Sequence, residues 1–200
     1  MDVQELRPGL WRWTGSHPEW NHAEHWGPDV ASVYAELDDA VVVVDPLVPE
    51  DEEERFWAAL DRDVERAARP LHVLLTVHWH ERSVAAVLDR YHAQLWRPEE
   101  KGELPAGVRA ETVQGSDWVE ALFFLEQHRA LVAGDLLIGR DGGIELPLEW
   151  FPKDERDWAQ NELKPQLHER LAALPIELVL VSHGEPVLQD GAAAVSRALS

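Results

Sequence analysis

Two histidines with one residue between them, His78 and His80, come directly after the apolar run 71–77. Side chains two residues apart in an extended chain point to the same side, so the two imidazoles could face one metal ion. Imidazole nitrogen is a common protein ligand of zinc and other transition metals. In a chain with 10 His among 200 residues, a pair at this spacing arises by chance about half the time, so other residues must support the hypothesis.

Three more apolar runs also end at residues that can bind a metal or move a proton. These are Asp45 after residues 40–44, Asp135 after residues 130–133 and His183 after residues 177–181. Open α/β sheets place their sites at the carboxyl ends of strands, so we expect the four strand ends to meet. Gly134 and Gly184 would allow the backbone to approach closely there.

Strands and helices must position these residues, and the hydrophobic pattern predicts both. Strands are predicted at residues 6–13, 30–36, 40–44, 71–77, 94–97, 108–113, 118–125, 130–133 and 177–181. Helices are predicted at residues 50–69, 84–91, 154–174 (with a kink at Pro165) and 191–199. Residues 14–28 and 139–143 are predicted loops, and residues 98–107 a charged connection. Because strands, helix and strands occur twice, we expect an α/β or α+β sandwich with two similar halves, roughly 1–100 and 101–200, in one domain over 1–200.

The composition describes an ordinary globular chain and narrows the range of partners. The net charge of −20 repels nucleic acid, and no apolar run reaches the length of a membrane span, so we expect neither partner. The chain has no cysteine and no visible secretory signal, which favours a cytoplasmic location and restricts metal ligands to His, Asp and Glu. The oligomeric state is left open.

The order of these motifs resembles that of the metallo-β-lactamase fold superfamily over nearly the whole chain. The segment 41–46, Val-Val-Val-Val-Asp-Pro, resembles that family's strand ending in Asp, and the segment 76–83, Thr-Val-His-Trp-His-Glu-Arg-Ser, lies where the family has His-x-His-x-Asp-His. Gly134-Asp135 resembles the Gly-Asp that supplies a bridging carboxylate, and His183 resembles the last strand-end histidine. The resemblance implies a four-layer αββα sandwich and one or two zinc, iron or manganese ions that activate water.

The chain also departs from the family pattern at three ligand positions. Arg82 and Ser83 occupy the places of the family's Asp-His, and Ser116 lies where a third histidine is expected after Gly115. The resemblance therefore implies only four metal ligands, His78, His80, Asp135 and His183. It does not imply a standard two-metal site.

The ligands that remain could still bind a single metal ion. His78, His80 and Asp135 offer two imidazoles and a carboxylate, enough for one divalent ion with open positions, and His183 could be a fourth ligand or contact substrate. We interpret Asp135 and Arg82 as the catalytic residues, because Arg82 stays charged, disfavours a second cation and could hold a substrate carboxylate or phosphate. Asp45 is interpreted as structural, orienting loops near the site.

Two functions follow from the resemblance. The first is a hydrolase with a mononuclear metal site that acts on a small ester, lactone or thioester. The alternative is a metal-free, non-catalytic protein that binds a small ligand or a protein partner through a Trp-rich pocket; His78 and His80 would then be core or pocket histidines. The loop 14–28 belongs at the same face, so His17, His22 or His25 could replace a missing ligand.

Overall fold

The computed structural model describes residues 1–100 and 102–200; Lys101, within the predicted connection 98–107, lies outside the described residues. The first half of the chain builds a six-stranded sheet whose spatial order follows the chain order. Its strands are β1 (Asp2–Arg7), β2 (Leu10–Ser16), β3 (Asp29–Glu36), β4 (Val41–Val44), β5 (Leu71–Leu74) and β6 (Gln94–Trp96). β1 to β4 are antiparallel neighbours, whereas β4, β5 and β6 run parallel.

The second half builds a four-stranded sheet in the order β12-β9-β8-β7 and a separate hairpin. The sheet strands are β7 (Val108–Gln114), β8 (Val119–Leu125), β9 (Ala130–Ala133) and β12 (Leu178–Val181), and the hairpin strands are β10 (Ile138–Arg140) and β11 (Gly143–Glu145). β12 runs parallel to β9, so Asp135 and His183 follow strands that end at the same edge.

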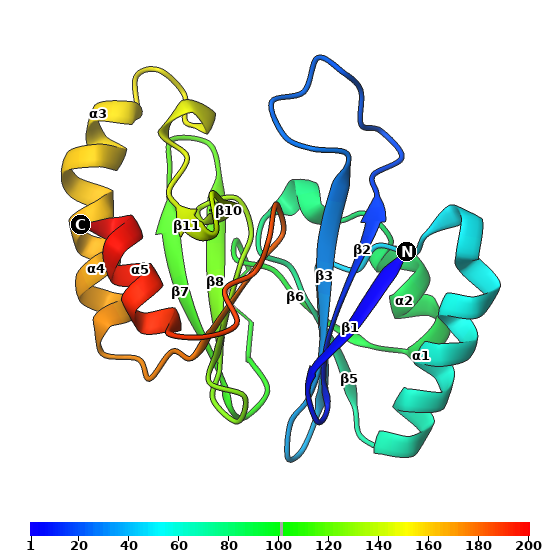
Figure 1. The fold of residues 1–200 in the computed structure, drawn as a ribbon. Helices are drawn as coiled ribbons and strands as arrows, with labels where there is room; N and C mark the ends of the chain where they lie inside the picture. The colour runs from blue at the N-terminus through cyan, green and yellow to red at the C-terminus, as the bar shows by residue number, and fades with distance from the viewer. Residues whose placement is uncertain (101) are drawn as a thin grey trace.

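Helices cover the outer face of each sheet, and the two sheets face each other (Figure 1). On the first sheet lie α1 (Glu53–Ala67), preceded by η1 (Glu50–Glu52), and α2 (Val84–Tyr91); on the second lie α3 (Arg156–Trp158), α4 (Lys164–Ala172) and α5 (Gly191–Leu199). Three buried clusters separate the four layers: one between each sheet and the helices that cover it, and one between the two sheets. The α+β fold and the four-layer αββα sandwich predicted from the sequence are confirmed.

Strand β4 consists of four valines and lacks the alternation of polar and apolar residues that is typical of a strand with one exposed face. Val41 and Val43 pack in the cluster under α1 and α2, whereas Val42 and Val44 pack in the cluster between the sheets. Successive side chains of a strand point to opposite faces, and both faces of this strand are covered. The same burial on both faces accounts for the apolar runs of β5, β9 and β12.

Three segments differ from the prediction for local reasons. The predicted strand 6–13 is a hairpin of β1 and β2, because Gly9 takes the left-handed conformation (φ +76°) that its turn requires. The predicted loop 139–143 is the β10–β11 hairpin, whose Asp141 and Gly142 both have positive φ, as a two-residue turn prefers. The predicted helix 154–174 contains a π segment, η4 (Ala159–Leu163), immediately before the residue pair Lys164 and Pro165, since Pro165 has no N–H to donate.

Across the described residues, no helix combines the length and the apolar character that crossing a membrane requires.

Candidate metal centre

A buried carboxylate at the end of β4 fixes the orientation of His80. Asp45 is 2% exposed and has a positive φ of 46°. Its side chain accepts hydrogen bonds from the backbone N–H of Thr76 (2.9 Å) and from Thr76 Oγ1 (2.5 Å), and its Oδ2 lies 2.8 Å from His80 Nδ1. The Nδ1 side of the ring is therefore occupied, and Nε2 points the other way. The expectation that Asp45 orients a loop near the site agrees with these contacts.

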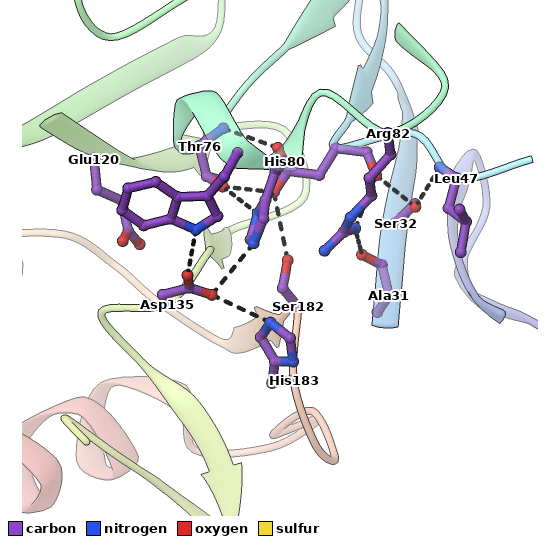
Figure 2. Close-up of polar contacts among 12 residues, drawn as sticks. Ala31, Ser32, Leu47, Thr76, His80, Arg82, Glu120, Asp135, Ser182 and His183 are labelled. Carbon is purple, nitrogen blue, oxygen red and sulfur yellow. Dashed lines mark hydrogen bonds and ion pairs between the residues drawn. The ribbon is translucent and has the colours of Figure 1, made fainter. Parts of the chain in front are cut away.

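Asp135 lies opposite His80 and also meets His183, which follows a strand of the same sheet as Asp135 (Figure 2). Asp135 Oδ1 is 3.3 Å from His80 Nε2 and 3.2 Å from His183 Nε2, while Oδ2 accepts a 2.7 Å hydrogen bond from Trp79 Nε1. One ligand atom from each of His80, Asp135 and His183 lies within 4.8 Å of the other two. These three residues, from both halves of the chain, form what we call the His-Asp-His cluster.

Only glycine fits immediately before Asp135. A Cβ at Gly134 would lie 2.5 Å from Thr76 Oγ1 and 2.9 Å from Glu120 Oε1, closer than real Cβ contacts. The absence of a side chain lets β9 approach the residues that hold His80. The close approach expected at Gly134 is therefore present.

Burial and neighbouring charges shift the pKa values of the residues in the cluster. Burial and Arg82 oppose the protonation of His80, but Asp135 and Asp45 outweigh them and raise the pKa of His80 to about 9. Burial would raise the pKa of Asp135, yet His80 and His183 hold it well below its usual range. Burial lowers the pKa of His183. Near neutral pH the metal-free cluster thus contains a charged His80 beside a charged Asp135.

The cluster offers donor atoms that could hold one divalent transition metal ion. Asp135 Oδ1 is buried and, within residues 1–100 and 102–200, has no partner in hydrogen-bonding geometry, although two imidazoles lie near it. Two nitrogens and one oxygen form a donor set that zinc, iron(II) and manganese all accept. Because Trp79 already occupies Oδ2, Oδ1 is the carboxylate atom available to an ion.

His78, predicted as a ligand beside His80, is not in this cluster. β5 ends at Leu74, and residues 78–80 form the 3₁₀ helix η2 (His78–His80) instead of extended chain. With three residues per turn, side chains two residues apart lie about 240° apart around the helix and point in different directions. The His78 side chain is 52% exposed, with Nδ1 3.6 Å from Glu99 Oε1. The assumption of extended backbone at this position is wrong.

Arg82, which the sequence comparison placed at a ligand position of the family, lines the same cavity but lies outside the His-Asp-His cluster. Its Nη1 donates to the carbonyl oxygens of Ala31 (3.0 Å) and Asp45 (3.2 Å), and its backbone has a positive φ of 30°. Ser83 Oγ accepts a hydrogen bond from the N–H of Val48 (2.9 Å), so its hydroxyl serves to hold a loop.

Glu120, near the start of β8, also faces the cluster and was not predicted as a site residue. It is 2% exposed, and its Oε1 accepts a hydrogen bond from the N–H of Leu136 (2.9 Å). Burial and the neighbouring Asp135 raise the pKa of Glu120 well above its usual range. A single carboxylate in the otherwise apolar run 118–125 was the signal in the sequence that could have identified it.

The cluster lies at the bottom of a cavity of about 560 Å³ with aromatic walls. Trp26 and Trp150 both contact the ring of His183 edge-on, with centroids 5.2 Å away, and Trp79, Trp118 and Phe151 complete the walls. From the loop 14–28, His17 and His25 line the cavity, whereas His22 packs on Trp20. None of these three histidines joins the described ligand group, so the structure gives no replacement for the missing ligands.

Neither a protein-family model nor a curated protein matches the sequence. Solved structures do match its fold. The DIM-1 metallo-beta-lactamase superposes with a TM-score of 0.61 at 13% identity, covering 98% of this chain and 97% of its own. A metallo beta lactamase from Erythrobacter litoralis gives 0.58 at 15% identity over 98% and 89% of the two chains, and a beta-lactamase domain protein from Burkholderia ambifaria gives 0.58 at 17% identity over 98% and 74%. The TM-scores and the coverage show a shared fold along nearly the whole chain, and at such low identities the chemistry must be argued from the residues of the site.

Proposed function

Since the chain has the metallo-β-lactamase fold, we propose that it is a hydrolase-like protein with one divalent metal ion, held by His80, Asp135 and His183. The convergence of these three ligand atoms within 4.8 Å carries the proposal. It differs from the ligand set expected from the sequence by omitting His78, which is exposed. Zinc, iron(II) and manganese all suit this donor set.

The residues around the cluster would each serve the ion or a bound molecule. When bound, such an ion lowers the pKa of a water and polarises a carbonyl oxygen. Asp45 accepts a hydrogen bond from Nδ1–H of His80 and so leaves Nε2 as the ligand atom, as partners of metal-binding histidines commonly do. Burial and the neighbouring Asp135 raise the pKa of Glu120, which favours its neutral form, a hydrogen-bond donor within the cavity. The aromatic walls exclude water and bind apolar groups of a substrate.

We propose a small ester, lactone or thioester as the substrate. The cavity has the volume of a small-molecule site and is lined by aromatic side chains with a few converging polar groups. The net charge of −20 argues against a nucleic-acid substrate. The fold hosts many reactions, so the bond that is cleaved must be found by assay.

A metal-free binding protein is the alternative, and one observation favours it. The carboxylate of Asp135 already faces His80, His183 and Trp79, so its charge is compensated without any ion. In that case the same aromatic cavity would bind a ligand and leave it unchanged.

Metal titration separates the two functions and tests the ligand set. Chelator-stripped protein is titrated with zinc, iron(II) or manganese by calorimetry, and the bound metal is then quantified by elemental analysis. We expect about one equivalent in the wild type and a loss of binding in His80→Ala and His183→Ala. His78→Ala is the matched control: it removes a neighbouring imidazole outside the cluster and should keep the ion.

Two results would contradict the proposal. No bound ion in the wild type would leave the metal-free alternative. Loss of the ion in His78→Ala, with circular dichroism unchanged, would show that His78 is a ligand after all. About one bound metal ion per wild-type chain would justify a screen of esters, lactones and thioesters.

A further inference from the structure

Arg82 is a cation inside the cavity, and no carboxylate of the described residues forms a direct ion pair with it. Its Nη1 binds two backbone carbonyl oxygens, and its Nε is buried with no hydrogen-bond partner in the described part of the chain. No carboxylate there lies within ion-pair distance of the guanidinium, although 17 other ion pairs are present. A guanidinium keeps its charge at any physiological pH, and a desolvated charge without a counter-ion is unfavourable.

The guanidinium is fixed and directed towards the cavity. The bonds from Nη1 to Ala31 and Asp45 anchor one side of the group, and Figure 2 shows its other end directed to the side where His80 and His183 lie. It lines the same cavity as His80, His183 and His17. A held, planar donor group of this kind suits the two oxygens of a carboxylate.

The acidic residues near Arg82 do not pair with its guanidinium directly. Asp45 and Asp135 attract Arg82 at longer range and favour its charged form against burial, but both carboxylates are directed at His80. Glu120 Oε1 accepts a hydrogen bond from the N–H of Leu136, and Glu19 and Asp117 line the rim, where both are exposed to solvent. An anionic group of a ligand would supply the direct partner that the guanidinium lacks among the described residues.

The walls indicate what the rest of the ligand is. Trp26 and Trp150 stand on the ring of His183, and Trp79 is 48% exposed at the mouth of the cavity. Flat indole faces and edges favour a planar or aromatic group over a polar, flexible one. We propose that the cavity binds a carboxylate-bearing molecule with a flat apolar body, and that Arg82 recognises its carboxylate. This inference rests on the proposed function, because it names the substrate class of the same site.

The inference can be tested in metal-free protein by comparing the binding of an acid with that of its neutral amide. The probes are 2-naphthylacetate and the neutral 2-naphthylacetamide, titrated by calorimetry into chelator-stripped wild-type protein. We expect the acid to bind at least about tenfold more tightly, which is the contribution of one charge-assisted interaction. Arg82→Gln should reduce the acid to the affinity of the amide and leave the amide unchanged.

Arg97→Gln is the matched control, since Arg97 pairs with Glu81 outside the cavity lining. It should keep the preference for the acid. Arg82→Lys keeps the charge without the planar fork and should retain only part of the preference. Equal affinities in the wild type, no binding of either probe at millimolar concentration, or a preference that survives in folded Arg82→Gln would each overturn the inference.

A second measurement covers the case in which Arg82→Gln does not fold. The side-chain Nε–H signal of Arg82 in wild-type ¹⁵N spectra should move on addition of the acid and stay in place with the amide; a signal that ignores the acid overturns the inference. Because these experiments use metal-free protein, failure of metal binding and failure of carboxylate recognition give separate results.

Discussion

At the scale of single residues, His80 connects the electrostatics of the site to the stability of the chain. Its pKa is raised to about 9 by Asp135 and Asp45, against the opposing effects of burial and Arg82. A raised folded-state pKa stabilises the protein fully below the unfolded value, about 6.5, and this contribution is lost as pH rises through 9. The same two carboxylates thus make the metal-free fold sensitive to mild alkali.

We therefore expect the unfolding free energy of the metal-free protein to fall between about pH 6.5 and 9, by on the order of 3 kcal/mol. Urea unfolding at intervals across this range measures it. His80→Gln should flatten the curve, while His78→Gln, changed two residues away outside the cluster, should not. An unchanged slope in His80→Gln would show that another group is responsible.

The sequence predicts the positions of some site residues and not of others. Asp135 and His183 were predicted correctly as neighbours, because each directly follows a buried strand and two parallel strands bring them to one edge. His78 was misplaced because three residues of extended chain were assumed where the backbone turns into a 3₁₀ helix. Glu120 was missed because it lies within a strand, where position along the chain does not reveal which face its side chain takes.

At the scale of elements, a pair of glycines fixes the turn that carries His183. A Cβ at Gly184 would lie 2.1 Å from the carbonyl oxygen of Gly139, and Gly184 has a φ of +82°. The N–H of Gly139 donates to the carbonyl oxygen of His183 (2.8 Å), so β10 and the turn after β12 touch backbone to backbone. A close backbone approach at Gly184 was predicted, but Gly139 was not predicted as its partner, because residues 139–143 were assigned to a loop.

Gly184→Ala should therefore move His183 as well as destabilise the fold. We expect a loss of about 1–3 kcal/mol from the forced backbone shift. Ion affinity should fall at least about tenfold, as for other changes that disturb the orientation of a ligand. Calorimetry and urea unfolding measure the two effects. Gly27→Ala is the control, because an added Cβ there meets nothing within 4 Å. An unaltered affinity in folded Gly184→Ala would show that the backbone contact between Gly184 and Gly139 does not position His183.

Most elements themselves were predicted with close boundaries. The helices at 84–91 and 191–199 begin and end at the predicted residues, since each has an amphipathic pattern bounded by strand or turn residues. The exceptions are turns: the hairpins at Gly9 and at Asp141 and Gly142 depend on left-handed backbone conformations, and hydrophobic periodicity carries no information about them.

At the scale of the whole molecule, the cluster joins the two sheets. Asp45 and His80 come from the first sheet, and Asp135 and His183 come from the second. Backbone bonds cross at the same place: the N–H of Ala31 donates to Ser182, and the N–H of Ala121 donates to Thr76 (both 2.8 Å). An ion at the cluster would therefore bind only when both halves are folded.

We expect ion binding to stabilise both halves in one step. At an ion concentration about 100 times Kd, the gain is about 2.7 kcal/mol, or a rise in Tm of about 5–10 °C for a chain of this size. Scanning calorimetry of the stripped and loaded protein measures it, with His183→Ala as the variant that should show no rise. Two separate transitions, with only one moved by the ion, would contradict the coupling.

The hydrogen bond from Trp79 Nε1 to Asp135 Oδ2 gives the protein a built-in optical reporter. An indole whose N–H is bound to the carboxylate of the cluster emits according to the charge and solvation of that carboxylate. Trp26 and Trp150, packed on His183, stand equally close to any occupant. Trp79→Phe would remove the first signal and leave the other two, so tryptophan fluorescence can distinguish occupancy of the carboxylate from occupancy of the aromatic wall without an added label.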